Sequence, residues 1–354
     1  MRPSRRAGSV ESLVVSAPRS RNGDSACRPA GRLARADRSG ERFLIAMVGV
    51  GAYKAGAFLA RRVPDGVATA AARLGGFGAG MLAGDAGTIV GRNLERVYGR
   101  ELGSAEKRRK IAETFEWYSR YYVESFRLPA VGVEELDRGF SYDGVGTIEK
   151  HCGPGKSGAI LALPHLGTWE WAAFWLARVI DVKVTAIVEP LQPPELFDWF
   201  VGLRESLGME IHPLGPNAFK QILAALKQGH LVCLLCDRDL QGTGVPVDFF
   251  GERTTLPAGP ATLALRTGVP LMPSAVYWRS SARHGLCGRP LQIERTGRLR
   301  DDVQRVTQMI ADDFEMLIRQ APEQWHLLNP NWPSDYEALG REIPEHLQGL
   351  GGGR

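Results

Sequence analysis

The sequence lacks the features that mark several large classes of protein. Five cysteines among 354 residues, an odd number, are too few for a disulfide scaffold and fit a reducing compartment. No G-x-G-x-x-G follows an apolar strand-like run, which disfavours a nicotinamide enzyme. The seven histidines show no metal-ligand spacing, and no metal is expected. Apolar residues at 44% and charged residues at 23% are ordinary values, so disorder, collagen and coiled coil are excluded as the main class.

An uninterrupted hydrophobic run long enough to span a bilayer is also missing. The stretch 43–60 is apolar except for Lys54, and the stretch 71–90 contains Asp85. A spanning helix needs about 20 apolar residues. Both stretches therefore predict helices that lie in the membrane interface or pack on the core.

Positive charge is concentrated at the N-terminus. Residues 1–40 contain nine arginines and three acidic residues, a net charge of +6, whereas the remaining 314 residues sum to −1. A uniformly basic, nucleic-acid-binding body is therefore unexpected. The segment 1–40 has few large apolar residues and is predicted to be a disordered tail. It would serve either as an anchor on an anionic surface or as an extension without function.

The remainder reads as helices followed by an alternating α/β region. Apolar residues recur at three- or four-residue steps over 105–126, which predicts an amphipathic helix. Beyond 157, short apolar runs alternate with helical segments. We expect strands at 159–163, 182–188, 231–236 and 271–278, and helices at 169–179, 194–207, 217–228, 258–267 and 301–320. This pattern is typical of βαβ crossovers and predicts an α/β fold with a mostly parallel sheet flanked by helices. The expected organisation is the tail 1–40, a domain 41–335 (N-terminal helices 41–130 and an α/β core 140–335) and a C-terminal tail 336–354.

The segment AILALPHLGTWEWAAFW (159–175) carries the most specific chemistry. His165 is expected at the carboxyl end of a buried strand, where ligands bind in open α/β sheets, and Glu170 follows in the first turn of the next helix. A carboxylate on one imidazole nitrogen fixes the tautomer and makes the other nitrogen a better base for a substrate hydroxyl. No serine or cysteine nucleophile stands at this turn, so direct transfer is favoured over a covalent intermediate. The alternative is that His165 caps a strand and Glu170 favours a helix N-terminus.

A second charged group follows the strand predicted at 231–236. Asp237, Arg238 and Asp239 should point into the same crevice and bind substrate or brace the turn that carries His165, and the resemblance given below implies sugar hydroxyls as the groups bound; a turn with capping carboxylates is the alternative. Asp248 is a further candidate for hydroxyl recognition. Arg253, with the helix that opens near Gly259, is a candidate for holding a phosphate, although a simple proline-glycine helix start explains the helix equally well.

These segments together resemble a known family. The His-x4-Glu motif, followed by CDRDLQGTGVPVDFFGERTTLPAG (236–259), resembles the glycerolipid-type acyltransferases. Within them the chain is most similar to the bacterial lipid A lauroyl/myristoyl acyltransferases and their actinobacterial relatives, the phosphatidylinositol mannoside acyltransferases. RNLERVYG (92–99), WYSRYYVESFRLP (117–129) and EPLQPPELFDWFVGLRESLGMEI (189–211) carry the same resemblance, which spans about 43–335. One position departs: the mannoside enzymes usually have Asp where this chain has Glu170.

The resemblance implies an O-acyltransferase with a His165–Glu170 pair as general base. It implies acyl-CoA as co-substrate (acyl carrier protein in some relatives), a membrane glycolipid acceptor with an acylated mannose hydroxyl, no cofactor, and a peripheral place on the cytoplasmic face of the plasma membrane. Glu189 and Arg204 are carried over as substrate-binding residues, with an ordinary surface ion pair as the alternative. Trp169, Trp171 and Phe174 are expected to line an acyl pocket unless they are ordinary core. The alternatives for function are a different acceptor of the lipid A type, a non-catalytic lipid-binding protein and a hydrolase.

Overall fold

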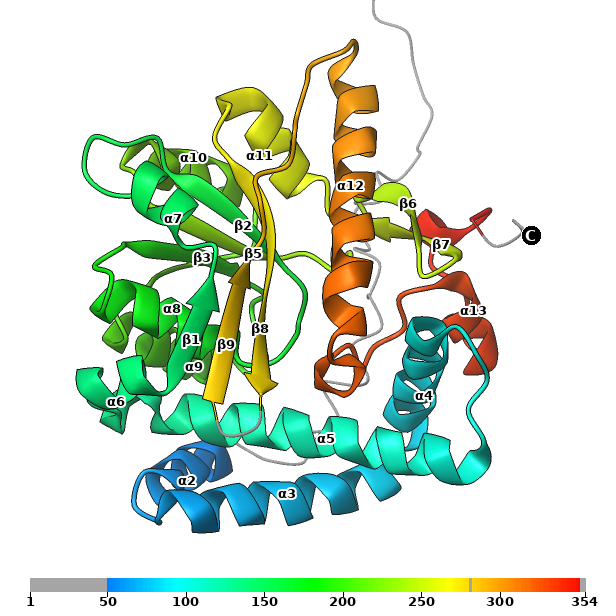
Figure 1. Cartoon of the computed structure of the whole chain (residues 1–354). Coiled ribbons are helices and arrows are strands. Elements are labelled where there is room, and N and C mark those ends of the chain that lie inside the picture. The colour runs from blue at the N-terminus through cyan, green and yellow to red at the C-terminus, as the bar shows by residue number, and fades with distance from the viewer. Residues whose placement is uncertain (1–49, 280–281, 351–354) are drawn as a thin grey trace, which may run out of the picture. The chain divides into compact units, whose positions relative to one another are not determined.

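The computed structural model describes residues 50–279 and 282–350. The predicted tail 1–40 and the beginning of the apolar stretch 43–60 lie outside the described residues. Figure 1 shows a central sheet with helices on both faces and a further set of helices across one of its ends. The α/β fold with a mostly parallel sheet is therefore confirmed.

A seven-stranded sheet forms the centre, in the order β1-β9-β8-β2-β5-β3-β4. Only the β8–β9 pair is antiparallel. The strands are β1 (Phe140–Asp143), β2 (Ala159–Leu163), β3 (Val184–Val188), β4 (Glu210–Pro213), β5 (Leu231–Leu235), β8 (Leu271–Arg279) and β9 (Ala282–Cys287). A separate hairpin joins β6 (Val245–Phe249) to β7 (Glu252–Leu256). The adjacent strands β2 and β5 contain only apolar residues, because both faces of a parallel sheet are covered.

Side chains of β2 and β5 alternate between two hydrophobic cores, as the two-residue period of a strand requires. Ile160 and Val232 belong to the core that also takes in helices α10 (Ala218–Lys227), α11 (Gly259–Thr267) and α12 (Leu299–Arg319). Leu161 and Cys233 belong to the core under α7 (Gly146–His151) and α8 (Trp169–Arg178). The helix α9 (Pro194–Ser206) follows β3.

The N-terminal helices cover one end of the sheet. They are α2 (Val50–Ala60), α3 (Asp65–Met81), α4 (Gly84–Tyr98), α5 (Ser104–Arg127) and α6 (Val133–Arg138). In Figure 1, α5 runs across the end of the sheet, with α3 alongside it. A Cβ on Gly76 would lie 2.5 Å from the carbonyl oxygen of Phe115, so only glycine permits this close approach of α3 and α5.

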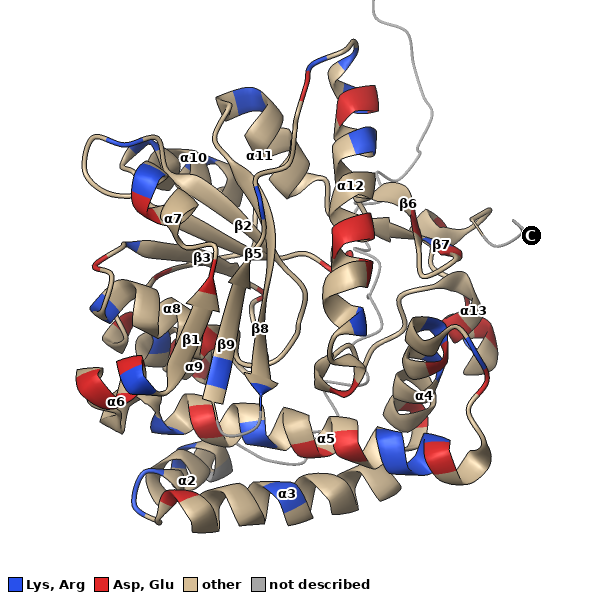
Figure 2. Ribbon diagram, viewed as in Figure 1, with Lys and Arg blue, Asp and Glu red and all other residues tan. Residues whose placement is uncertain are grey.

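The outer side of α2 and α3 is unusually apolar for a surface. Its exposed large side chains are Phe58, Leu59, Val67, Leu74, Phe77, Met81 and Leu82. Figure 2 shows few charged residues along α3, where Asp65 and Arg73 are the only charged side chains. Among the described residues, no helix combines the length and the hydropathy that a membrane span requires.

Several elements differ from the sequence-based expectations. The stretch 71–90 is not one helix but the end of α3 and the beginning of α4. Strands β1, β4, β6, β7 and β9 were not predicted. Within the predicted C-terminal tail, the described residues 336–350 pack on the body, because Tyr336 in α13 (Pro333–Ala338) and Leu347 are both buried.

Candidate active site

His165 lies in the turn between β2 and α8, as the sequence predicts. The strand ends at Leu163, and the helix begins at Trp169. The turn passes so close to β8 that a Cβ on Gly167 would lie 1.8 Å from the carbonyl oxygen of Val276, and Gly167 has φ of +62°. Only glycine accepts both constraints. The side chain of His165 is one-quarter exposed, on the wall of the largest cavity described.

Asp237 is the carboxylate that contacts the imidazole. It follows β5, the parallel neighbour of β2, so the carboxyl ends of the two strands place Asp237 beside His165. Its Oδ1 lies 2.5 Å from His165 Nδ1, and its Oδ2 accepts a hydrogen bond of 3.0 Å from the His165 backbone N–H. Burial alone would raise the pKa of Asp237, but the contacts with His165 outweigh burial and hold the pKa below its ordinary value. The carboxylate is therefore ionised at neutral pH, and it holds both the ring and the backbone N–H of His165.

The expected His165–Glu170 pair is wrong. Glu170 lies in the first turn of α8 but faces α5 and α9, where its Oε1 accepts hydrogen bonds of 2.8 and 2.6 Å from Nε and an Nη of Arg204. Its Oε2 accepts a hydrogen bond from the Ser125 hydroxyl. Burial would lower the pKa of the Arg204 guanidinium, but Glu170 and Tyr121 raise it above the ordinary value. Glu170 thus fixes α8 to α5 and α9, and the carboxylate that contacts His165 is that of Asp237.

A cavity of about 410 Å³ opens beside His165, within the range of roughly 300–1,000 Å³ typical of ligand sites. Aliphatic side chains from the sheet and from α10 and α11 line much of it. They include Ile187, Leu191, Leu214, Ile222, Leu234 and Leu263. The first residues of α11, including Gly259, reach the same cavity. The walls therefore suit a long apolar group whose reactive end lies near His165.

Several predicted polar residues are brought to this cavity. Glu189, Arg204, Arg238 and Asp239 all line it. Glu189 and Arg238 form an ion pair at 3.3 Å, so the sequence was right to group these charges but did not reveal their pairing. Asp239 accepts hydrogen bonds from the backbone N–H groups of residues 241–244, the closest at 2.7 Å from Gly244. Asp239 thus braces the loop that follows, which is the turn alternative.

Other predicted residues lie elsewhere. Asp248 and Arg253 face each other across the β6–β7 hairpin as an exposed ion pair at 3.6 Å, and neither lines the cavity. Of the three aromatics expected in an acyl pocket, only Trp169 lines it. Trp171 and Phe174 point into the core between α8 and the sheet, because they lie on the inner side of the helix. The ordinary-core alternative holds for these two residues.

Sequence reasoning missed an aromatic wall. Tyr53 of α2 and Tyr118, Tyr121 and Tyr122 of α5 line the cavity, together with His326. The tyrosines of α5 fit the apolar stripe of an amphipathic helix, so their pattern gave only a packing signal. The ring of His326 lies 5.3 Å from the ring of Tyr118, and burial lowers the pKa of His326 to about 3. His326 is therefore a neutral imidazole beside the catalytic turn.

Known proteins resemble this chain over most of its length. The family model described as bacterial lipid A biosynthesis acyltransferase matches residues 40–334. A phosphatidylinositol mannoside acyltransferase of Mycolicibacterium smegmatis is 36% identical over 289 residues, which are 80% of this chain and 91% of the relative. A phosphatidylinositol mannoside acyltransferase of Mycobacterium tuberculosis is 37% identical over 249 residues, 69% of this chain and 76% of the relative. A histidine–carboxylate pair at the head of an apolar cavity, in a chain matched to this extent, makes the protein an acyltransferase that belongs to the bacterial lipid A biosynthesis acyltransferase family.

Proposed function

We propose that this enzyme transfers a fatty acyl group from acyl-CoA to a mannose hydroxyl of a phosphatidylinositol mannoside. The observation that carries the proposal is the His165–Asp237 pair beside a long apolar cavity, in a chain whose relatives are named phosphatidylinositol mannoside acyltransferases. The relatives support the acceptor, and the cavity supports a fatty acyl donor.

The reaction needs one base and no covalent enzyme intermediate. With Nδ1 of His165 committed to Asp237, Nε2 is left to accept the proton of the acceptor hydroxyl. The hydroxyl oxygen then forms a bond to the thioester carbonyl carbon, and the carbon–sulfur bond breaks as the tetrahedral intermediate collapses. The proton held on His165 passes to the departing thiolate. The products are the glycolipid ester and free CoA, and His165 returns to its neutral form.

The two substrates would occupy different parts of the cavity. The aliphatic side chains that line the cavity, among them Ile187, Ile222 and Leu263, suit the acyl chain. The Glu189–Arg238 ion pair offers acceptors and donors for sugar hydroxyls, and Arg204 adds a fixed positive charge. An acyl carrier protein is the alternative carrier for the same thioester.

Peripheral attachment to the cytoplasmic face of the plasma membrane would bring the glycolipid to this cavity. The helix α2 contributes Tyr53 to the cavity wall and exposes Phe58 and Leu59 on its outer side. Leu74 and Leu82 are 78% and 84% exposed, and Lys54 and Arg62 flank the apolar face. An apolar face with basic flanks suits binding to the interface of an anionic membrane.

The test is acyl transfer from radiolabelled palmitoyl-CoA to phosphatidylinositol dimannoside by purified enzyme, with the His165→Ala variant as control. We expect a labelled acylated glycolipid from the wild type and none from the variant. Free fatty acid without labelled glycolipid, still dependent on His165, would contradict the proposed acceptor and indicate a hydrolase. Equal product from both proteins would contradict the role of His165 as base.

A further inference from the structure

A short segment near the C-terminus lies directly against the catalytic turn. Its backbone runs antiparallel to residues 165–167: the Gly167 N–H donates to the carbonyl of Gln324 at 3.0 Å, and the His326 N–H donates to the carbonyl of His165 at 2.7 Å. Between these two bonds, Trp325 faces Leu166 in an isolated antiparallel bridge. The position of Trp325 relative to His165 is therefore set by the backbone on both sides of it.

The indole of Trp325 reaches the carboxylate that holds His165. Its Nε1–H donates to Asp237 Oδ2 at 2.8 Å, and the same oxygen accepts the backbone N–H of His165 at 3.0 Å. Two donors on Oδ2 leave Oδ1 for the imidazole. Asp237 and Trp325 are both buried, so this hydrogen bond is made away from bulk solvent.

The packing around Trp325 fixes the direction of its N–H. The ring centroids of Phe249, Phe250 and Trp332 lie 6.0, 5.7 and 6.4 Å from that of Trp325. Nearby, Asn331 Nδ2 donates to the backbone carbonyl of Asp237 at 3.3 Å. The Trp325 side chain therefore has little room to turn away from Asp237.

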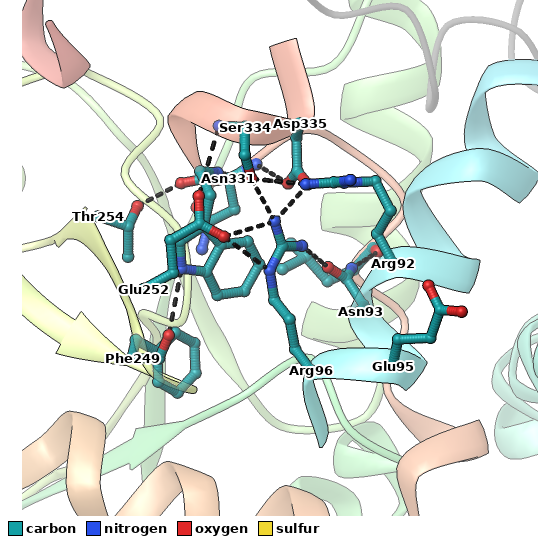
Figure 3. A network of polar contacts seen from close by, with 12 residues as sticks. Arg92, Asn93, Glu95, Arg96, Phe249, Glu252, Thr254, Asn331, Ser334 and Asp335 are labelled. Carbon is teal, nitrogen blue, oxygen red and sulfur yellow. Dashed lines mark hydrogen bonds and ion pairs between the residues drawn. The ribbon is translucent and has the colours of Figure 1, made fainter. Parts of the chain in front are cut away.

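A polar network ties this part of the chain to α4 (Figure 3). The Asp335 carboxylate accepts hydrogen bonds from the backbone N–H groups of Asn331 and Trp332, at 3.1 and 3.3 Å. It also forms ion pairs with Arg92 and Arg96, at 2.8 and 2.7 Å. The network holds residues 331–335 in place and, through Asn331, the backbone at Asp237.

We propose that Trp325 is a positioning residue that fixes the rotation of the Asp237 carboxylate against His165 through its indole N–H. The inference rests on the proposed function, since it assigns Trp325 to the base of that reaction. Donation to Oδ2 stabilises the negative carboxylate, as hydrogen bonding to a charged form does. Without this hydrogen bond, the Asp237 carboxylate attracts the Nδ1 proton of His165 more strongly and rotates more freely. His165 then accepts the proton of the acceptor hydroxyl more slowly, and it does so only at higher pH.

The other ionisable groups near the pair do not account for such an effect. His326 has its pKa lowered to about 3, and burial raises the pKa of Cys236 above its ordinary value, so both stay neutral across the working range. Among the charged residues of the cavity, Arg204 pairs with Glu170, Glu189 pairs with Arg238, and Asp239 accepts hydrogen bonds from the backbone N–H groups of residues 241–244. A change in the pH profile on removing the indole N–H therefore reports on Asp237 and His165.

The test compares Trp325→Phe with Trp175→Phe in the intact chain, using the acyl-transfer assay. Trp175 is the matched control, because it is a buried tryptophan whose indole N–H donates to a different carboxylate, Asp137 Oδ1, at 2.8 Å, in the core on the other face of the sheet. For Trp325→Phe we expect kcat to fall about tenfold, the size often seen on losing a supporting hydrogen bond. KM should change less than about twofold, and the pH of half-maximal kcat/KM on the acid side should rise by about 0.5 unit. The control should change neither kcat nor this pH.

A double-mutant cycle separates positioning from a general loss of structure. In the Asp237→Asn background, Trp325→Phe should lower kcat by less than about twofold, because the carboxylate through which it acts is absent. Equal tenfold losses in both backgrounds, or equal losses from Trp325→Phe and Trp175→Phe, would overturn the inference. Wild-type enzyme is assayed in every series. A wild type without His165-dependent transfer would refute the proposed function, whereas active wild type with an unaffected Trp325→Phe would refute only the role of Trp325.

Discussion

The buried pair of Glu170 and Arg204 gives the sharpest prediction, because stability and catalysis should separate there. The Glu170 side chain is 2% exposed and that of Arg204 is 13% exposed. Replacing Glu170 by Gln preserves shape but leaves the Arg204 charge buried without its counter-charge. We expect the free energy of unfolding to fall while the His165–Asp237 pair stays intact.

The size of the loss follows from the contacts. Breaking a buried ion pair on one side costs about 3–5 kcal/mol. Glu170 accepts two hydrogen bonds from Arg204, at 2.8 and 2.6 Å, and bonds to charged groups contribute about 1.5–3 kcal/mol each. Because Gln keeps one carbonyl acceptor, a loss of about 3 kcal/mol is expected. At about 2–4 °C per kcal/mol, the range for domains somewhat smaller than this one, Tm should fall by roughly 6–12 °C.

The assay measures Tm by circular dichroism, and acyl transfer at a temperature well below the melting points of all variants. In Glu170→Gln, kcat should stay within about threefold of wild type, because no catalytic proton passes through Glu170. In the comparison variant Asp237→Asn, kcat should fall by about 10²- to 10⁴-fold, the range attributed to a general base. If Glu170→Gln loses activity as severely as Asp237→Asn while its Tm is unchanged, the assignment of these two carboxylates is refuted.

Three further predictions follow from other sites. Burial lowers the pKa of the His326 imidazole to about 3, against 6.5 in the unfolded chain. Between these two pH values only the unfolded chain binds the proton, so the free energy of unfolding decreases as the pH falls. Urea titrations should show wild type losing up to about 1.4 kcal/mol per pH unit more than His326→Phe between about pH 6 and pH 4; parallel curves would contradict this. Asp248→Asn should change the rate of acyl transfer less than about twofold and the free energy of unfolding by less than about 0.5 kcal/mol, because its ion pair with Arg253 is exposed. Weaker binding of either substrate by this variant would indicate that Asp248 does contact substrate. Leu74→Asp should reduce sedimentation with anionic phospholipid vesicles several-fold, whereas Met316→Asp, an equally polar change at an exposed position on α12, should not; equal effects would exclude α3 as the membrane face.

The parts of the fold that the sequence predicted are those with a strong local pattern. The strand expected at 159–163 matches β2 residue for residue, because a strand buried on both faces is a continuous apolar run. The hairpin β6–β7 and the strand β4 gave no such signal. Their residues mix polar and apolar side chains, and β6 contains Pro246. Their pairing is decided by the neighbouring elements rather than by their own composition.

The candidate site shows the same division. The sequence predicted both His165 and Asp237 at strand ends, but it favoured Glu170 as the partner of His165. Glu170 is only five residues from His165 along the chain, whereas Asp237 is 72 residues away, and a contact over that distance leaves no local sequence pattern. The order of the sheet decides the matter: β2 and β5 are neighbours, with Leu163 opposite Leu235. The contact of Trp325 with Asp237 is less visible still, since it depends on how the end of the chain returns across the sheet. Local spacing was enough to select His165, whereas its contact with Asp237 depends on the order of the strands.

The distance along the chain between the parts of the site also bears on how the enzyme is made. The proposed base, His165, and its carboxylate, Asp237, follow β2 and β5, but the indole that touches the carboxylate is that of Trp325, and the network behind it joins Arg96 to Asp335. Domains fold during synthesis from the N-terminus onward, and contacts between distant residues form late. On the ribosome, the nascent chain would carry His165 and Asp237 well before the elements that fix their geometry exist. Acyl-transfer competence should therefore arise only after residues 324–335 have been synthesised and have closed over the turn at His165, which is made long before them.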